Sequence, residues 1–301
     1  KWKSVLHVWI RFQLISVLTL LSVKLPCCAK IFLNELYKIT IFWLHGLSNV
    51  IYTMNSNSIS FVHGFYQNLP FRFKEVGASV FFIPNISIGL IILGLFLIFM
   101  IIIKIWDLLR PIKGRKRFII LLFCIFSGII GFVGIMYIPI VLYSVLNLKL
   151  ALFTHSLFTG SFVISIIFLV IILLFIFYCL FRLFGNKDYL FNPINTAKYY
   201  YFFAGNRKNS KYFLYDIFCW IAWFIIAIML ALLLNNPKTQ ILIILFIIVL
   251  VFLFCLIIKP MESTFYWICE LISFLFLIIS LILITIIAFI NNHKCSACKS
   301  S

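Results

Sequence analysis

Residues 241–258 read ILIILFIIVLVFLFCLII, an unbroken apolar run with no charged residue. A run of this length forms a helix about as long as the hydrocarbon core of a bilayer is thick. Five further blocks are comparably long and apolar, with no charge near their centres; they cover residues 79–103, 118–148, 157–183, 213–234 and 265–290. The sequence therefore predicts an all-α polytopic membrane protein with six firm transmembrane helices.

Two earlier blocks are weaker. Residues 5–23 carry Arg11, and residues 31–52 carry Glu35 and Lys38. Each block is long enough to span with its charges near one end, and each also fits an amphipathic helix lying in the membrane interface. The prediction is up to eight transmembrane helices. It divides the chain into residues 1–78 with the two weak helices and an external loop, a six-helix core at 79–290, and a polar tail at 291–301.

The composition excludes an ordinary soluble domain. The chain is 65% hydrophobic and 11% charged, against about 45–50% and about 25% in soluble domains. The net charge of +18 does not indicate nucleic-acid binding, because the basic residues lie in short loops beside apolar runs, as the positive-inside rule requires. We expect anionic lipid headgroups to be their partners.

Two basic connectors set the predicted orientation. The first, residues 104–117, contains Lys104, Arg110, Lys113, Arg115, Lys116 and Arg117. The second, residues 185–212, contains Lys187, Lys198, Arg207, Lys208 and Lys211. Both should face the cytoplasm or an equivalent compartment, since basic loops stay on that side. The turn at 259–263 then faces inward, and the links at 147–156 and 235–240 face outward.

Three glycines recur every three residues inside the block at 118–148. Gly128, Gly131 and Gly134 fall near one helix face, where small residues let a second helix approach closely. Pro139 follows in the same block, which is longer than one membrane thickness and therefore fits a kinked or tilted helix. Helix packing is the main interpretation, and a hinge is the alternative.

Ionisable residues inside a membrane are candidates for function. Asp216 lies in the predicted first turn of its helix, where the helix dipole favours a negative charge. Glu270 lies about two turns into the last helix, among apolar neighbours. Both are candidate membrane ionisable residues, and for each an interfacial depth is the simpler alternative.

Other motifs offer no catalytic chemistry. The chain has no nucleotide-binding glycine loop, no metalloprotease motif and no potassium-channel filter, so we predict no catalytic residue, cofactor or metal site, and no enzyme. Cys295 and Cys298 form one C-x-x-C, which lacks the second pair of a closed zinc site; a disulfide and two free thiols both stay open. Asn85 begins a formal glycosylation sequon beside a helix start.

Short motifs in a fixed order extend over roughly residues 41–283. They are Leu69–Pro70, residues 82–85, 137–140, 144–148, 199–201, 207–213, 237–240, 258–260, 262–263 and 267–270. This order resembles the membrane region of the transient-receptor-potential-like family of protists and fungi, with its polycystin-like and flavin-carrier-like members. The resemblance implies ion transport or membrane scaffolding and an external domain upstream of Lys1, and it carries over no catalytic residue.

Two functional hypotheses follow. The first is a channel-like or transporter-like subunit in a plasma, ciliary or endomembrane, as the resemblance implies. Its path would be lined by the hydroxyls of Ser127, Ser144, Thr159, Ser161, Ser165, Ser273 and Ser280. The second is a non-catalytic structural subunit of a larger membrane complex, such as a mitochondrial respiratory or ATP synthase assembly. We expect either a homo-oligomer or other membrane subunits as partners.

Overall fold

The computed structural model describes residues 13–16, 20, 27–40, 48–58, 69, 73–74, 78–109, 132–134, 136–151, 153, 155–185 and 210–290. Its regular elements are helices. They are α2 (Cys27–Thr40), α3 (Ser48–Asn55), α6 (Phe82–Leu109), α8 (Ser156–Gly185), α12 (Ser210–Leu232), α13 (Pro237–Ile258) and α14 (Thr264–Ile290). A shorter apolar helix, Met136–Lys149, lies between α6 and α8 in sequence and is called the central helix below.

Within the described residues, five helices are long and apolar enough to cross a membrane: α6, α8, α12, α13 and α14. They coincide with five of the six firm predicted spans. The all-α, polytopic membrane fold is therefore confirmed, and the chain is an integral membrane protein. The ends of these helices differ from the predicted ends by a few residues, because apolar runs omit the polar residues of the first and last turns.

The remaining firm block, residues 118–148, is described only in its second half. That half contains the central helix, and Gly134 just before it is buried. Gly128 and Gly131 lie outside the described residues, so their packing role stays a prediction. The central helix includes Pro139, and its backbone stays helical there.

The two weak blocks have different outcomes. Of residues 5–23 the structure describes only 13–16 and 20, and these are buried. In the second block lie α2, of 14 residues, and α3, of 8 residues, with residues 41–47 outside the described part. Neither helix alone reaches the roughly 20 residues that a span needs. The boundary at residue 78 stays a prediction, and buried residues from both sides of it share one cluster.

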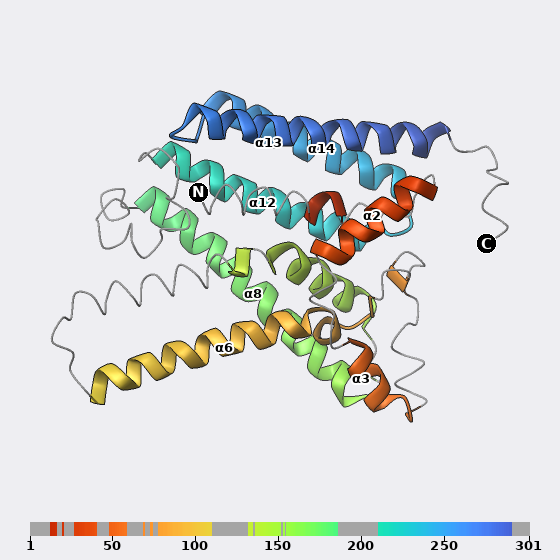
Figure 1. Cartoon of the computed structure of the whole chain (residues 1–301), viewed down its shortest axis with the longest axis vertical. Helices are drawn as coiled ribbons and strands as arrows, with labels where there is room; N and C mark the ends of the chain where they lie inside the picture. Colours follow the sequence, from red (N-terminus) through yellow and green to blue (C-terminus); the bar gives the residue numbers. More distant parts are fainter. Residues whose placement is uncertain are drawn as a thin grey trace.

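The long helices pack in a row. α13 contacts α12 and α14, α8 contacts α12, and α6 contacts α8. Figure 1 shows that α6 and α8 end, and α12 begins, at the same end of the bundle. These are the helix ends that the two basic connectors join, so the fold brings the connectors' attachment points to one side, as the predicted orientation requires.

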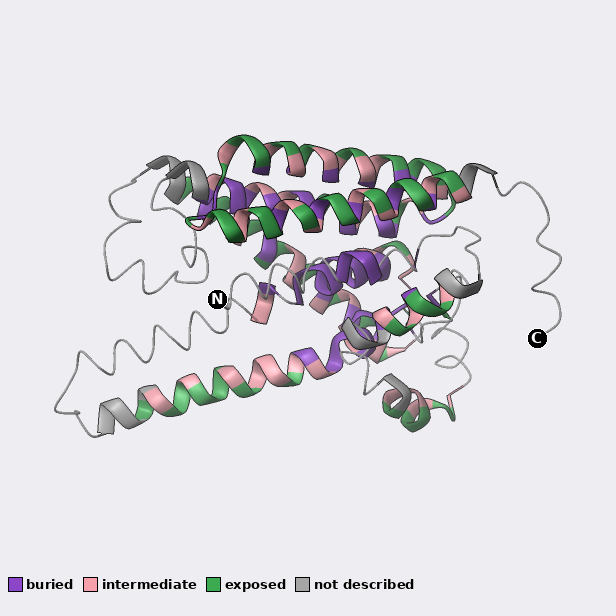
Figure 2. Ribbon diagram, turned by 45° about the horizontal axis from the view of Figure 1, so that its top comes forward, coloured by how far each residue is buried: buried purple, intermediate pink, exposed green. Residues whose placement is uncertain are grey.

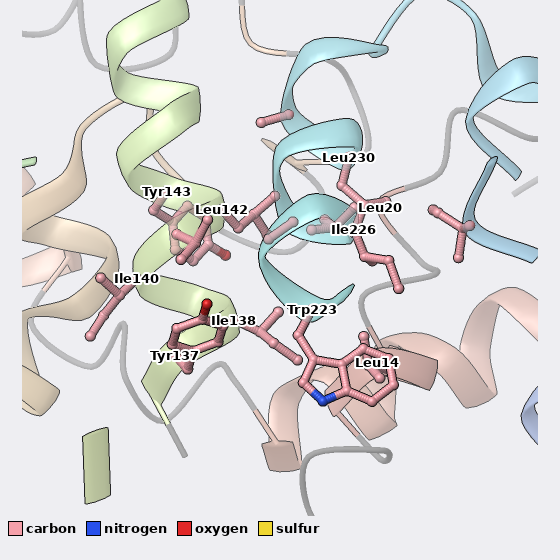
Figure 3. Close-up of a cluster of buried hydrophobic side chains, with 14 of the residues drawn as sticks. Leu14, Leu20, Tyr137, Ile138, Ile140, Leu142, Tyr143, Trp223, Ile226 and Leu230 are labelled. Carbon is pink, nitrogen blue, oxygen red and sulfur yellow. The ribbon is translucent and has the colours of Figure 1, made fainter. Parts of the chain in front are cut away.

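The central helix forms the middle of the core. Val141, Leu142 and Tyr143 are completely buried, and Figure 2 shows the helix as buried almost throughout. A helix that is apolar on nearly every side lies in a core or spans a membrane, and this one is buried among other elements. In Figure 3, Ile138 of the central helix lies close to Trp223 of α12. The hydroxyl of Tyr137 also donates to the Trp220 carbonyl of α12 at 3.0 Å.

Candidate functional site

A buried carboxylate site lies near the end of the bundle where α12 and α14 begin. Glu270 is the seventh residue of α14, about 9 Å along the helix axis from its start. Its side chain is 5% exposed. The Tyr215 hydroxyl of α12 donates to Glu270 Oε1 at 3.0 Å, and Tyr215 is itself completely buried. The structure therefore joins a sequence-predicted residue, Glu270, to one that the sequence did not single out.

Helix α13 holds the tyrosine in place. The Phe254 ring lies 6.3 Å from the Tyr215 ring, centroid to centroid, with 22° between their planes. Phe254 also packs on Phe218, one turn further along α12, at 4.6 Å. Aromatic pairs in this distance range attract one another. All three carboxyl-terminal helices thus contribute to the site, and the orientation of the Tyr215 hydroxyl depends on their packing.

The structure corrects the predicted position of Asp216. Helix α12 begins at Ser210, not at Phe213, and its first turn holds no acidic residue. Asp216 therefore lies in the second turn, and its side chain is 3% exposed. The predicted start was too late because the apolar run stops short of Lys211, whereas the helix itself already begins at Ser210. Since the helix dipole acts mainly within the first turn, it does not by itself account for a buried Asp216.

A second group of polar residues lies near the opposite end of the bundle. We call it the serine–asparagine network; it consists of Ser79, Asn85, Asn147, Ser161 and Ser165, all completely buried. The Ser79 backbone N–H donates to Asn85 Oδ1 at 2.8 Å, and Asn85 Nδ2 donates to the Ser79 carbonyl at 2.8 Å. This reciprocal pair fixes the backbone just before α6 to the first turn of the helix.

Asn147 connects the start of α6 to two other helices. Its Nδ2 donates to the Val80 carbonyl at 3.3 Å, and the Ser165 hydroxyl lies 3.2 Å from its Oδ1. Ser161 accepts the Ile83 backbone N–H at 3.1 Å. Buried polar groups in an apolar setting are costly unless paired, so these bonds hold α6, the central helix and α8 in register.

The predicted hydroxyl-lined path is not open at this network. Ser161 and Ser165 are completely buried, so no water-accessible space adjoins them in this conformation. Ser273 and Ser280 donate to carbonyls of their own helix at 2.8 Å. Ser144 is buried and Thr159 is exposed, and Ser127 lies outside the described residues. The hydroxyls therefore do not form one continuous row among the described residues.

The asparagine of the Asn85 sequon is buried within the same network. Asn85 is completely buried, and both atoms of its amide are hydrogen-bonded to Ser79. A glycosylated asparagine needs its amide nitrogen free and accessible at the surface. In this fold Asn85 is a structural residue that fixes the start of α6.

The carboxyl-terminal end of α12 has side-chain partners for its last carbonyls. Gln240 of α13 donates through Nε2 to the Leu230 carbonyl at 2.9 Å. Lys149, at the end of the central helix, donates through Nζ to the Leu232 carbonyl at 2.6 Å. The final carbonyls of a helix have no partner within it, and a cation is favourable there. These two residues therefore tie α12 to α13 and to the central helix.

Most of the predicted lipid-binding residues lie outside the described part of the chain. Lys104 lies within α6 and Lys211 in the first turn of α12. The others are outside the described residues: Arg110, Lys113, Arg115, Lys116, Arg117, Lys187, Lys198, Arg207 and Lys208. Anionic-lipid binding by the basic connectors stays a prediction. Cys295 and Cys298 likewise lie outside the described residues.

Tyr215, Asn147 and Lys149 are the residues that sequence reasoning missed. Asn147 and Lys149 appeared only as parts of a helix end and a short link, and Tyr215 only as part of the apolar block at 213–234. Their partners are far away in sequence: Tyr215 and Glu270 are separated by 55 residues. No local pattern encodes such a pairing, because it depends on which helices become neighbours.

In comparisons with protein-family models, with curated proteins and with solved structures, nothing matches this chain. Its function must therefore be inferred from its own geometry and chemistry. The two observations available for this are the buried Glu270–Tyr215 pair and the sealed serine–asparagine network.

Proposed function

We propose that this chain is a channel-like or transporter-like membrane subunit that moves ions or small solutes, with Glu270 contacting the transported cation or proton. One observation carries the proposal: a carboxyl group is buried between membrane-spanning helices and held by a tyrosine hydroxyl. Ionisable groups are expensive in a membrane interior and are usually kept there for transport or proton relay. The proposed role is binding and transport, not catalysis.

Each residue of the carboxylate site has a separate role in this proposal. Glu270 binds the cation or accepts the proton. Tyr215 orients the carboxyl group through its hydrogen bond, and Phe254 restrains Tyr215. The serine–asparagine network closes the opposite end of the bundle, because its members are completely buried. Transport then requires a second conformation in which this network opens while the carboxylate site releases its ion.

The resemblance to the transient-receptor-potential-like family supports the same proposal. It favours a plasma, ciliary or endomembrane location and assembly into a homo-oligomer. Under the proposed orientation the carboxylate site lies at the cytoplasmic end of α12 and α14. Anionic lipids would bind at the basic connectors on that side, since headgroup charge attracts juxtamembrane lysines and arginines.

The proposal is tested by flux through the full chain reconstituted in liposomes. Flux is measured for Na⁺, K⁺ and Ca²⁺ and, with an enclosed pH-sensitive dye, for protons. We expect Glu270→Gln to reduce the flux about tenfold or more, because the charged ligand is removed. Tyr215→Phe should mainly raise the half-saturating ion concentration, because the carboxyl group stays but is less well oriented.

The matched control is Glu262→Gln, which removes an exposed glutamate from the turn before α14. It should leave the flux unchanged. A wild-type chain that carries no flux of any of the four ions, or a Glu270→Gln variant that carries as much as the Glu262→Gln control, would contradict the proposal.

A second candidate function has its own supporting observation. The hydroxyls of Ser161 and Ser165 in the serine–asparagine network are bonded to protein groups and completely buried. Buried polar groups of this kind are typical of a structural core. This favours a non-catalytic subunit of a larger membrane complex, for example in the mitochondrial inner membrane. Isolation of the tagged chain from its native membrane in mild detergent tests it. A stable complex with electron-transfer or rotary subunits would support it and contradict the channel proposal.

A further inference from the structure

The turn between α13 and α14 contains an unusual backbone conformation. Lys259, the residue that ends α13, has φ 49° and ψ 62°. Among the described residues it alone combines a positive φ with a residue type other than glycine. Glycine is the usual residue at such a helix end, because a side chain is disfavoured there. A lysine held in this conformation is a reason to ask what its side chain does.

The Lys259 side chain has a defined position. Its Nζ lies 5.2 Å from the centre of the Trp267 ring on α14, within the range of a cation–π interaction. The ring itself is fixed, since Trp267 Nε1 donates to the Cys255 carbonyl at 3.2 Å. The same carbonyl accepts the Lys259 backbone N–H at 3.1 Å. One carbonyl thus anchors both the lysine backbone and the indole.

The surroundings of this pair are apolar and exposed. Ile257, two residues before Lys259, is 76% exposed, and Phe265 on α14 is 69% exposed. Both lie at the ends of membrane-spanning helices, where side chains of this kind contact lipid acyl chains. The first turn of α14 contains no acidic residue. Glu262 is exposed in the turn itself and opposes the binding of an anion.

We propose that the turn 259–263 binds the negatively charged headgroup of an anionic phospholipid, with the Lys259 ammonium as the main contact. Trp267 covers one face of the ammonium, and the exposure of Lys259 leaves its other side open to the headgroup. The acyl chains of the same lipid cover Ile257 and Phe265. This apolar pair favours a lipid over free phosphate, because a soluble anion would leave it uncovered.

The proposed orientation agrees with this ligand. It places the turn on the cytoplasmic side, where anionic lipids are concentrated and attract basic residues near the surface. The site is separate from the two basic connectors. Trp267 and Glu270 are three residues apart, on neighbouring positions of one face of α14, so a bound lipid would lie next to the carboxylate site. The binding of the lipid can be measured on the protein without any transport assay.

The test uses the full chain in detergent micelles mixed with phosphatidylserine or phosphatidylcholine, with bound lipid counted by native mass spectrometry. Lys259→Gly removes the ammonium and suits the positive φ, so it should fold at least as well as the wild type. We expect it to bind phosphatidylserine about fivefold more weakly. Lys259→Arg should retain binding.

Lys238→Gln is the matched control, because Lys238 is in the first turn of α13 at the opposite end of that helix. It should bind phosphatidylserine as the wild type does. Equal binding by Lys259→Gly and the wild type, equal loss in the Lys238→Gln control, or no preference for phosphatidylserine over phosphatidylcholine would overturn the proposal. Full displacement of phosphatidylserine by inorganic phosphate would show an anion site without lipid selectivity and would overturn it as well.

Discussion

Ser144 and Ser165 are buried serines with different surroundings. The Ser165 hydroxyl lies 3.2 Å from Asn147 Oδ1 and 2.7 Å from the Phe162 carbonyl. The Ser144 hydroxyl is buried and has no hydrogen-bond partner among the described residues. A buried hydroxyl without a partner costs free energy that a methyl group does not. The two residues therefore form a natural pair for measuring what the network contributes.

We expect opposite effects from removing the two hydroxyls. Ser144→Ala should raise the free energy of unfolding by about 1 kcal/mol, because an unpaired polar group is removed. Ser165→Ala should lower it by about 1–2 kcal/mol, because Asn147 loses a donor in a buried site. Unfolding of the purified full chain by SDS titration measures both changes. Equal changes of the same sign would show that the network does not distinguish these residues.

The residue scale also shows where sequence reasoning stops. Glu270 could be found from the sequence, because a glutamate inside an apolar block is rare and expensive. Tyr215 could not, since tyrosines are common at membrane edges and its role depends on a helix 55 residues away. Asn85 was misleading for a related reason: the sequon is a local pattern, whereas its burial is set by Ser79 and the packing of α6.

At the scale of helices, the apolar cores of the spans were predictable and their ends were not. The run at 241–258 predicted α13, yet the helix begins at Pro237. Proline suits the first turn of a helix, where its missing N–H is not needed, and Gln240 in that turn is buried against α12. Hydrophobicity alone does not predict such polar first turns. For the same reason Asp216 was predicted in the first turn of α12, although it lies in the second.

The end of α12 gives a prediction at this scale. Lys149→Met should lower the free energy of unfolding by about 1 kcal/mol, because the last carbonyls of α12 lose a cationic donor. The loss should appear in SDS titration of the full chain. Lys74→Met, which alters an exposed lysine, serves as the control and should change little. A Lys149→Met variant as stable as this control would contradict the proposed capping role.

At the scale of the whole molecule, the alternation of the helices fixes relative sides and leaves the absolute orientation to be measured. The ends of α6 and α8 and the start of α12 share one end of the bundle (Figure 1). The basic residues in the two connectors predict that this end faces the cytoplasm. The helix alternation and the charge pattern are consistent with one predicted topology.

We expect a protease site inserted after Lys198 to be cleaved only from the cytoplasmic side. A site inserted between Asn235 and Asn236, in the turn before α13, should be cleaved only from the other side. Sealed vesicles of known orientation, treated with external protease before and after permeabilisation, provide the measurement. Cleavage of both sites from the same side would contradict the predicted alternation of the helices across the membrane. Cleavage of each site from the side opposite to that expected would show that the orientation is reversed.

The burial of the central helix has a consequence for synthesis in the cell. During synthesis, Tyr137 is made 83 residues before Trp220, its hydrogen-bond partner on α12. At about 5–20 residues per second, that interval lasts roughly 4–17 s. Throughout it, the central helix lacks the partners that Trp220 and the end of α12 provide. Biogenesis of this protein should therefore depend on a membrane chaperone or on the insertion machinery retaining the helix until α12 arrives.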